Sequence, residues 1–251
     1  MGGRADGRSG GRLLLRTAVT IAAALLTAGP PVGLSAQVGH EPGHSPYHDI
    51  RRGAVLVATF GYVGGGRGSV GVGLSNGATG GIRWEPQLGA VGFSLGLAYG
   101  RTTSFAVDPN KDSLSRKSGP YDNAVVLADA GLQLVLTGRK TWRGFAPYVG
   151  GGLGVAISST VPGDSSGYRF GTKFTLAPNA GLRWYPARRF SVRGDVRLVL
   201  WKLNYPISYK VPEPAGCTPG TPGCSVVLPA AASLTEWTAH PWATIGVGWT
   251  F

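Results

Sequence analysis

The stretch FSVRGDVRLVLW, residues 190–201, alternates between two kinds of side chain at every second position. Successive side chains of a β-strand point to opposite faces, so this period of two predicts a strand over residues 190–204. One face carries Phe190, Val192, Gly194, Val196, Leu198 and Leu200. The other face carries Ser191, Arg193, Asp195, Arg197, Val199 and Trp201. This strand therefore has one apolar, uncharged face and one face that holds charges.

The same alternation recurs from residue 53 to residue 251 and predicts eight strands, at residues 53–63, 77–85, 90–103, 124–138, 145–158, 172–185, 190–204 and 237–251. Short connections (86–89, 139–144 and 186–189) alternate strictly with long ones (64–76, 104–123, 159–171 and 205–236). This alternation is typical of an up-and-down barrel whose termini share the end with the short turns. The predicted fold class is all-β, an eight-stranded antiparallel up-and-down transmembrane β-barrel.

Composition and patterning together favour lipid around the barrel. Charged residues make up only 14% of the chain, and 42 residues are glycine. A soluble barrel such as a lipocalin would show charges on its outside, whereas here the apolar faces are nearly free of charge. Aromatic residues gather at strand ends on the apolar face, as an interfacial girdle requires: Trp84, Phe145, Trp184, Phe190, Trp249 and Phe251. We therefore expect the apolar faces to contact lipid and the Gly-, Ser- and Thr-rich faces to fill the interior.

Residues 1–36 are typical of a secretory signal peptide, with four arginines, an apolar stretch over 17–28 and small residues before Gln37. The apolar stretch is shorter than the roughly 20 residues of a spanning helix. The predicted domains are the removed signal (1–36), an N-terminal leader (37–52) and the barrel (53–251). Without residues 1–36 the 24 basic and 12 acidic residues fall to 20 and 11, a net charge of +9. For an exported chain this balance favours anionic lipid head groups over nucleic acid as the partner.

The last strand ends in an apolar alternation of Ile245, Val247, Trp249 and Phe251. Two further stretches, PYVGGGLG at 147–154 and WYP at 184–186, contribute to the same family resemblance as this ending. On these three stretches, residues 50–251 resemble the small outer-membrane β-barrel family of the OmpA, OmpX and opacity-protein type. That family usually has Tyr where Trp249 stands.

The resemblance implies a bacterial outer-membrane location, periplasmic termini and four long extracellular loops. It also implies that the C-terminal alternation is an insertion signal read by the barrel-assembly machinery, with periplasmic chaperones assisting. Outer-membrane lipids and lipopolysaccharide would surround a monomer.

The inward faces carry a set of charges that we expect to form a lumen network: Arg83, Glu85, Asp129, Lys173, Arg183, Arg193, Asp195 and Arg197. Three acids face five bases in this set. Eight strands leave little more than side-chain space inside, and buried charges must pair, so we favour a salt-bridged plug. The alternative is a path for ions or small solutes, and the excess positive charge would suit a small anion.

Two further groups of residues suggest chemistry outside the barrel wall. His40, His44 and His48 repeat every four residues, which would align Zn or Ni ligands on a helix, but Pro42, Gly43 and Pro46 interrupt such a helix. We therefore interpret them as incidental histidines of a leader, with metal binding as the alternative.

Cys217 and Cys224 close a Pro/Gly-rich turn, and in an exported protein we expect them to form a disulfide with each other.

Catalysis would need a Ser or an acid with a His near the outer rim. Only His240 lies in the barrel region, with Ser233 and Glu236 nearby along the chain, and no serine motif accompanies it. We expect no cofactor and no catalysis. The favoured function is a structural or surface-interaction role in the outer membrane, followed by a narrow channel and then by a lipid-modifying enzyme.

Overall fold

The computed structural model describes residues 45–50, 53–159, 167–210 and 226–251. Residues 46–251 form one compact unit, which holds all the secondary structure of the described residues. The predicted signal peptide and most of the predicted leader lie outside the described residues. No helix within the described ranges is long and apolar enough to cross a membrane.

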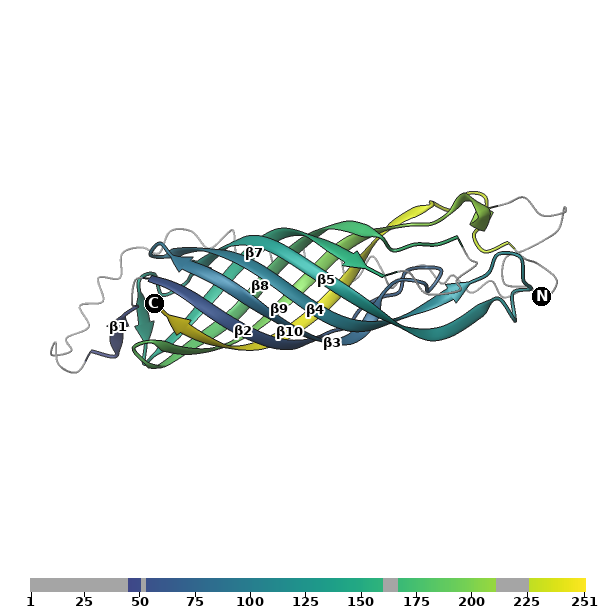
Figure 1. Ribbon diagram of the computed structural model, residues 1–251. Coiled ribbons are helices and arrows are strands. Elements are labelled where there is room, and N and C mark those ends of the chain that lie inside the picture. Colours follow the sequence, from purple (N-terminus) through teal and green to yellow (C-terminus); the bar gives the residue numbers. More distant parts are fainter. Residues whose placement is uncertain (1–44, 51–52, 160–166, 211–225) are drawn as a thin grey trace, which may run out of the picture. The chain divides into compact units, whose positions relative to one another are not determined.

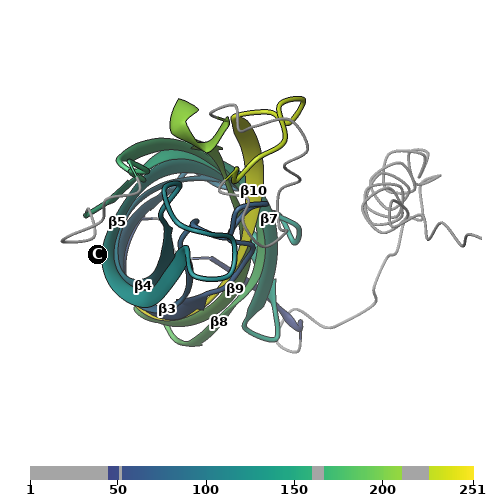
Figure 2. The ribbon, with the colours of Figure 1, turned by 90° about the vertical axis from the view of Figure 1, so that its right-hand side faces the viewer.

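Eight long antiparallel strands form the wall of a barrel (Figure 1). They are β2 (Gly53–Val63), β3 (Ser75–Gln87), β4 (Val91–Val107), β5 (Lys117–Val135), β7 (Phe145–Ser158), β8 (Thr172–Ala187), β9 (Phe190–Asn204) and β10 (Thr235–Thr250). Each strand pairs with the next one along the wall, and β10 pairs with β2 from Thr250↔Val55 to Trp242↔Val63. The sheet is therefore closed, and the predicted fold class is confirmed. Figure 2 shows the closed wall seen along the barrel.

The connections lie alternately at the two ends of the barrel, as predicted, but their lengths do not alternate strictly, because residues 136–144 and residues 108–116 form connections of equal length. Residues 88–90, 136–144 and 188–189 connect strands at one end, which we call the short-turn end. Residues 64–74, 108–116, 159–171 and 205–234 connect them at the other, the long-loop end. The C-terminus lies at the short-turn end (Figure 1).

Strands β4 and β5 are longer than predicted and form a hairpin beyond the other strands. Residues 104–123 had the Gly, Pro and Asp content of a loop, yet Ser104 pairs with Tyr121 and Val107 pairs with Lys117. The register shifts by one residue between Ser104 and Ala106, as in a β-bulge. Cross-strand pairing therefore overrides the local turn signals, and the connecting loop shrinks to residues 108–116.

Two short strands were not predicted. β1 (Tyr47–Asp49) belongs to the predicted leader, and β6 (Lys140–Trp142) belongs to the short connection between β5 and β7. They pair antiparallel, and Ile50 N extends the pairing by donating to Arg139 O over 2.9 Å. A three-residue strand carries too little period-two signal to be recognised from sequence. The remaining element is a short 3-10 helix, η2 (Ile207–Lys210), after β9.

The apolar faces of the strands point outward and the faces that hold charges point inward, as the alternation predicts. On β9, Leu198 is 41% exposed on the outer face, whereas its neighbour Arg197 is 3% exposed and points inward. The same inward and outward alternation runs along β7, β8 and β10. The buried side chains therefore fill the barrel interior, and the outside of the wall is an apolar surface.

Candidate functional site

Charged side chains meet inside the half of the barrel nearer the short turns. Glu85 on β3 accepts from Arg183 on β8 over 2.9 Å and forms an ion pair with Arg193 on β9. Gln133 on β5 also donates to Glu85, over 3.5 Å, and accepts from Arg183. The carboxylate of Glu85 thus joins strands that lie on different sides of the barrel.

Two aspartates continue this network. Asp195 pairs with Arg197 over 2.8 Å and with Arg193 over 3.2 Å. Asp129 pairs with Arg83 over 2.6 Å and with Arg197 over 3.4 Å. The hydroxyl of Thr244 on β10 donates to Asp195 over 2.6 Å. The three carboxylates of this network, Glu85, Asp129 and Asp195, therefore each pair with two arginines.

The network consists of four arginines and three carboxylates, which we call the lumen network: Arg83, Glu85, Asp129, Arg183, Arg193, Asp195 and Arg197. Charges removed from water are tolerated only when they are paired and hydrogen-bonded, and this arrangement meets that condition. Seven of the eight predicted lumen residues are brought together.

Lys173 is the eighth predicted lumen residue, and the prediction that it joins the network is wrong. Its side chain points inward and is buried, but it lies near the start of β8 at the long-loop end. Its ammonium is 5.9 Å from the centre of the Phe170 ring, and it forms no ion pair with a described residue. Strand parity predicted the correct face for Lys173 but not its height along the barrel.

Glycines on the inner face make room for the lumen network. A Cβ atom at Gly96 would lie 2.7 Å from both Arg83 Nη2 and Asp129 Oδ2. A Cβ atom at Gly181 would lie 2.5 Å from the hydroxyl of Tyr148. Such contacts are far inside van der Waals distance, so at these two positions only glycine leaves space for the Arg83–Asp129 ion pair and for Tyr148.

Between the network and the short turns, apolar side chains form a small cluster. Ile50 packs with Tyr185 against the buried side chains of Val135, Ala146 and Tyr148. The strand order sets β7 opposite β2, because three strands separate them on each side. Ile50 follows β1, which pairs with β6, and β6 pairs with β7, so Ile50 is held on the β7 side of the barrel. Gly53, the first residue of β2, is only three residues further along the chain, and three residues span at most about 11 Å. Ile50 therefore lies over the opening as a floor of the lumen.

Above the network, aromatic rings fill the half of the lumen nearer the long loops. Trp201 on β9 stacks on His240 of β10 with ring centres 3.9 Å apart, and meets Phe170 edge-on at 5.4 Å. Trp242 donates to the hydroxyl of Thr79 over 2.8 Å, and the guanidinium of Arg197 lies 5.2 Å from its ring. This aromatic layer belongs to one buried cluster with side chains of the long loops, among them Val72, Leu74, Tyr205, Tyr209 and Leu228.

The residues considered for catalysis do not form a triad. Glu236 accepts from the hydroxyls of Ser69, over 3.2 Å, and of Tyr205. Burial together with the bond to Glu236 raises the pKa of Tyr205 above its ordinary value. His240 bonds to Thr238 over 2.9 Å, and Ser233 bonds to Thr235. Ser233 in the loop before β10 and Glu236 and His240 on β10 therefore each bond to different partners.

The predicted insertion signal lies on the outer face of β10 and just beyond it. Ile245, Val247 and Trp249 point outward, and Phe251 N donates to Ala54 O over 3.0 Å after the end of the strand. The predicted girdle residues Trp84, Phe145, Trp184, Phe190 and Trp249 all lie near the short turns. Phe145 and Trp184 stack with ring centres 6.2 Å apart.

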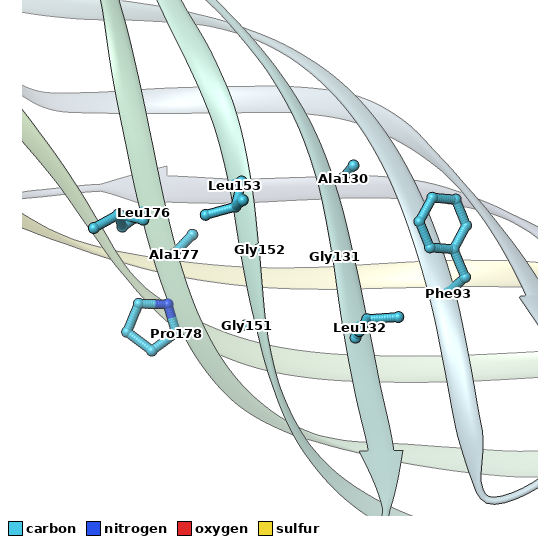
Figure 3. Close-up of a pocket in the computed structure, with 10 residues that line it drawn as sticks. All are labelled: Phe93, Ala130, Gly131, Leu132, Gly151, Gly152, Leu153, Leu176, Ala177 and Pro178. Atoms are coloured by element: carbon cyan, nitrogen blue, oxygen red, sulfur yellow. The ribbon is translucent and has the colours of Figure 1, made fainter.

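A shallow groove of about 460 Å³ crosses the outer face where Gly151 lacks a side chain (Figure 3). Phe93, Leu132, Leu153, Leu176 and Pro178 surround it. Its lining is apolar throughout, so the groove continues the apolar surface of the wall and offers no group for chemistry.

A second pocket, of about 480 Å³, lies at the short-turn end between β1, β6 and the β8–β9 turn. Its lining includes His48, Asp49, Thr141, Tyr185 and Arg188. Within the described ranges, no group of three or more His, Cys, Asp or Glu side chains could hold a metal ion. His40 and His44 lie outside those ranges, as do Cys217 and Cys224. The interpretation of the histidines as incidental, with metal binding as its alternative, therefore stays a prediction, as does the disulfide.

Several partners of the lumen network were not singled out from the sequence: Ser94, Gln133, Tyr148 and Thr244. Tyr148 accepts from Arg193, and the guanidinium of Arg183 lies 4.7 Å from its ring. The signal was present, because Tyr148 has the same parity as Gly150 and Gly152 on the inner face. What parity cannot provide is the height at which side chains from different strands meet.

Comparison with solved structures shows the fold. The chain is similar to the outer membrane protein OprG from Pseudomonas aeruginosa, with 14% identity and a TM-score of 0.50, covering 81% of this chain and 98% of OprG. It is also similar to Neisserial surface protein A (12% identity, TM-score 0.45, 82% of this chain and 98% of that one). A third similar structure is Ail, the attachment invasion locus protein of Yersinia pestis, with 12% identity and a TM-score of 0.39, covering 80% of this chain and 100% of Ail. No family model and no curated protein sequence matches the chain.

Proposed function

We propose that this chain is an outer-membrane barrel with a closed lumen and a structural or surface-interaction role. The observation that carries the proposal is the filling of the interior by three successive layers. These are the apolar floor with Ile50, the lumen network, and the aromatic layer around Trp201. A barrel filled in this way serves as an anchor in the membrane rather than as a path through it.

The outer surface supports a membrane location. Large apolar side chains are exposed along the wall, such as Phe60, Ile82, Leu132 and Ile245, which are all more than half exposed. Soluble monomers rarely expose contiguous apolar surface on this scale, whereas lipid stabilises it. Trp237 and Trp249 stand 12 positions apart on β10, which for a strand tilted by about 40° corresponds to roughly 30 Å across the membrane. That height matches a bilayer core bounded by aromatic residues.

The resemblance to small outer-membrane barrels supports an orientation with the short turns in the periplasm and the long loops outside. The same resemblance supports outer-membrane lipids and lipopolysaccharide as surroundings, and the barrel-assembly machinery and periplasmic chaperones as partners in biogenesis.

The hairpin of β4 and β5 is the best candidate for a surface contact. It projects past the other strands, and Leu114 near its tip is 78% exposed. Other long loops contact the hairpin where its strands end, next to the tip: Tyr209 donates to Val107 O over 3.2 Å, and Arg116 donates to Val226 O over 2.8 Å. A braced hairpin with an exposed apolar tip suits binding to another surface.

The channel alternative has one observation in its favour, because four arginines face three carboxylates in the lumen network. An anion path would require those ion pairs to separate inside the barrel. Breaking a buried pair costs about 3–5 kcal/mol, so the network opposes conduction.

Cysteine labelling tests membrane sidedness. Leu114→Cys and, as the matched control, Arg188→Cys are made in a Cys217→Ser/Cys224→Ser background, and intact cells are treated with a membrane-impermeant maleimide. We expect Cys at 114 to label in intact cells and Cys at 188 only after the outer membrane is permeabilised. The reverse pattern would overturn the orientation, and equal labelling of both in intact cells would overturn the membrane location.

A further inference from the structure

The short-turn end carries an unbalanced set of positive charges. Five basic side chains are exposed in its turns, namely Arg139, Lys140, Arg143, Arg188 and Arg189. None of them forms an ion pair with another described residue. Asp49 is the one acidic side chain exposed among residues 45–50, 88–90, 136–144 and 186–189. We call these five residues the basic rim.

Arg188 of the basic rim lines the pocket of about 480 Å³ described above, and the lining residues Thr141 and Gly144 are sequence neighbours of Lys140 and Arg143. The pocket exists because β1 docks on β6: Thr141 donates to His48 O over 3.3 Å, and Arg143 N donates to Pro46 O over 2.7 Å. Its other wall is fixed by Tyr185 N, which donates to Gly144 O over 2.8 Å. The pocket walls are therefore held by hydrogen bonds, while the basic side chains around it are free to meet a ligand.

Arg143 adds a second observation. Its backbone has φ 51°, a left-handed conformation, because Arg143 and Gly144 are the two turn residues between the paired Trp142 and Phe145, and tight hairpin turns of this length favour positive φ at both positions. Gly144 beside it has φ 84°. The guanidinium of Arg143 lies 5.3 Å from the Trp142 ring, and Trp142 is 47% exposed. The turn thus presents a cation beside an exposed aromatic ring.

The position of the rim identifies the class of ligand, on the premise of the proposed function. Tryptophans and other aromatics of a membrane barrel lie at the level of the lipid head groups. Trp142 and the stacked pair Phe145–Trp184 lie on or next to the turns that carry the basic rim. Basic side chains at this level face the phosphates of the nearer leaflet.

We propose that the basic rim and its pocket form a site for the phosphate of an anionic glycerophospholipid in the leaflet at the short-turn end. Arg188 and Arg189 on one side and Arg143 on the other bind the phosphate oxygens, since guanidinium groups bind phosphate in a bidentate manner. Asp49 lines the same pocket and opposes an anion. The site therefore has one group that weakens binding and several that strengthen it.

Native mass spectrometry of the folded barrel in detergent micelles tests the proposal, with dimyristoyl-phosphatidylglycerol and dimyristoyl-phosphatidylcholine as the two probes. We expect the anionic dimyristoyl-phosphatidylglycerol to bind more tightly than the zwitterionic dimyristoyl-phosphatidylcholine. Arg188→Gln and Arg189→Gln should each weaken it by about fivefold, the effect of roughly one basic charge near a lipid surface. Asp49→Asn should strengthen it. Arg101→Gln/Lys202→Gln, which removes exposed charges near the long loops, is the matched control and should leave the preference unchanged.

Opposite effects of Arg188→Gln and Asp49→Asn cannot come from loss of folding alone. Equal affinity for both lipids, or an equal loss in the control variant, would overturn the proposal. Competition with inorganic phosphate at constant ionic strength tests whether the site binds a lipid phosphate or free phosphate. If inorganic phosphate displaces the lipid fully, the site binds free phosphate and the lipid assignment is wrong. A barrel that fails to insert into vesicles of either lipid contradicts the proposed function, whereas an inserted barrel without lipid preference contradicts only this inference.

Discussion

Glu85 and Arg193 form an ion pair across the interior of the barrel, between β3 and β9, and each side chain is only 3% exposed. Strands β2 and β10 stand between β3 and β9 in the wall, so the pair is not a contact of neighbouring strands. Arg183 on β8 binds the same carboxylate. This single carboxylate therefore links separate parts of the wall and occupies the space that a pore would need.

Removing that carboxylate should be costly. Glu85→Ala leaves Arg183 and Arg193 buried with fewer partners, and we expect the free energy of unfolding to fall by about 3–5 kcal/mol. Urea unfolding in phospholipid vesicles, followed by tryptophan fluorescence, measures it. Lys111→Ala is the control, because its ion pair with Asp108 spans 3.8 Å and the Lys111 side chain is 61% exposed, so the loss of this pair should cost less than about 1 kcal/mol. Equal effects of the two changes would show that the lumen network is not what stabilises the barrel.

Neighbouring residues on β9 provide a test of the two faces. Leu198→Arg places a charge in lipid and should reduce barrel stability by about 2–4 kcal/mol. Arg197→Leu changes the inner face and should leave membrane insertion intact. The amount of each variant in purified outer membranes gives the comparison. Urea unfolding does not separate the two variants, because Arg197→Leu also breaks buried ion pairs with Asp129 and Asp195 and lowers the free energy of unfolding. If Leu198→Arg reaches the outer membrane in the same amount as Arg197→Leu, the assignment of inside and outside is wrong.

The C-terminal residue should control assembly. Deleting Phe251 or changing it to Ser removes the terminal aromatic of the predicted insertion signal, and we expect the protein to be degraded in the periplasm. Immunoblotting of outer-membrane fractions measures the loss. Wild-type levels of either variant would argue against the role assigned to the alternation of Ile245, Val247, Trp249 and Phe251.

The strand pattern was predictable because one rule, the alternation of side chains, determines both the strands and their faces. Residues 190–201 predict β9 and its charged face, and the structure confirms both. The rule fails where pairing depends on distant residues. Residues 104–107 and 117–123 pair against their local composition, and Tyr47–Asp49 form β1 only because β6 is beside them.

The candidate site was predictable in its members but not in its arrangement. Parity identified Arg83, Glu85 and the other inward charges, yet it could not separate Lys173, which lies at another height. The pocket at the short-turn end was outside the reach of sequence analysis altogether. It requires the leader to fold back on residues 140–142, and the two segments are about 90 residues apart in the chain.

The two cysteines lie outside the described residues, and their pairing remains a prediction. We expect Cys217 and Cys224 to be bonded to each other in the exported protein. The Cys217→Ser/Cys224→Ser variant should insert normally and become more sensitive to protease added outside intact cells. Labelling of the untreated wild-type protein on intact cells by an impermeant maleimide would show free thiols and end this prediction.

Conductance in planar lipid bilayers tests the closed lumen most directly. The purified wild-type barrel, inserted and verified as folded, should give no current steps above the bare bilayer, because the floor at Ile50, the lumen network and the aromatic layer at Trp201 fill the interior in turn. Reproducible steps of defined size from the wild-type protein would contradict the central claim and make the chain a channel.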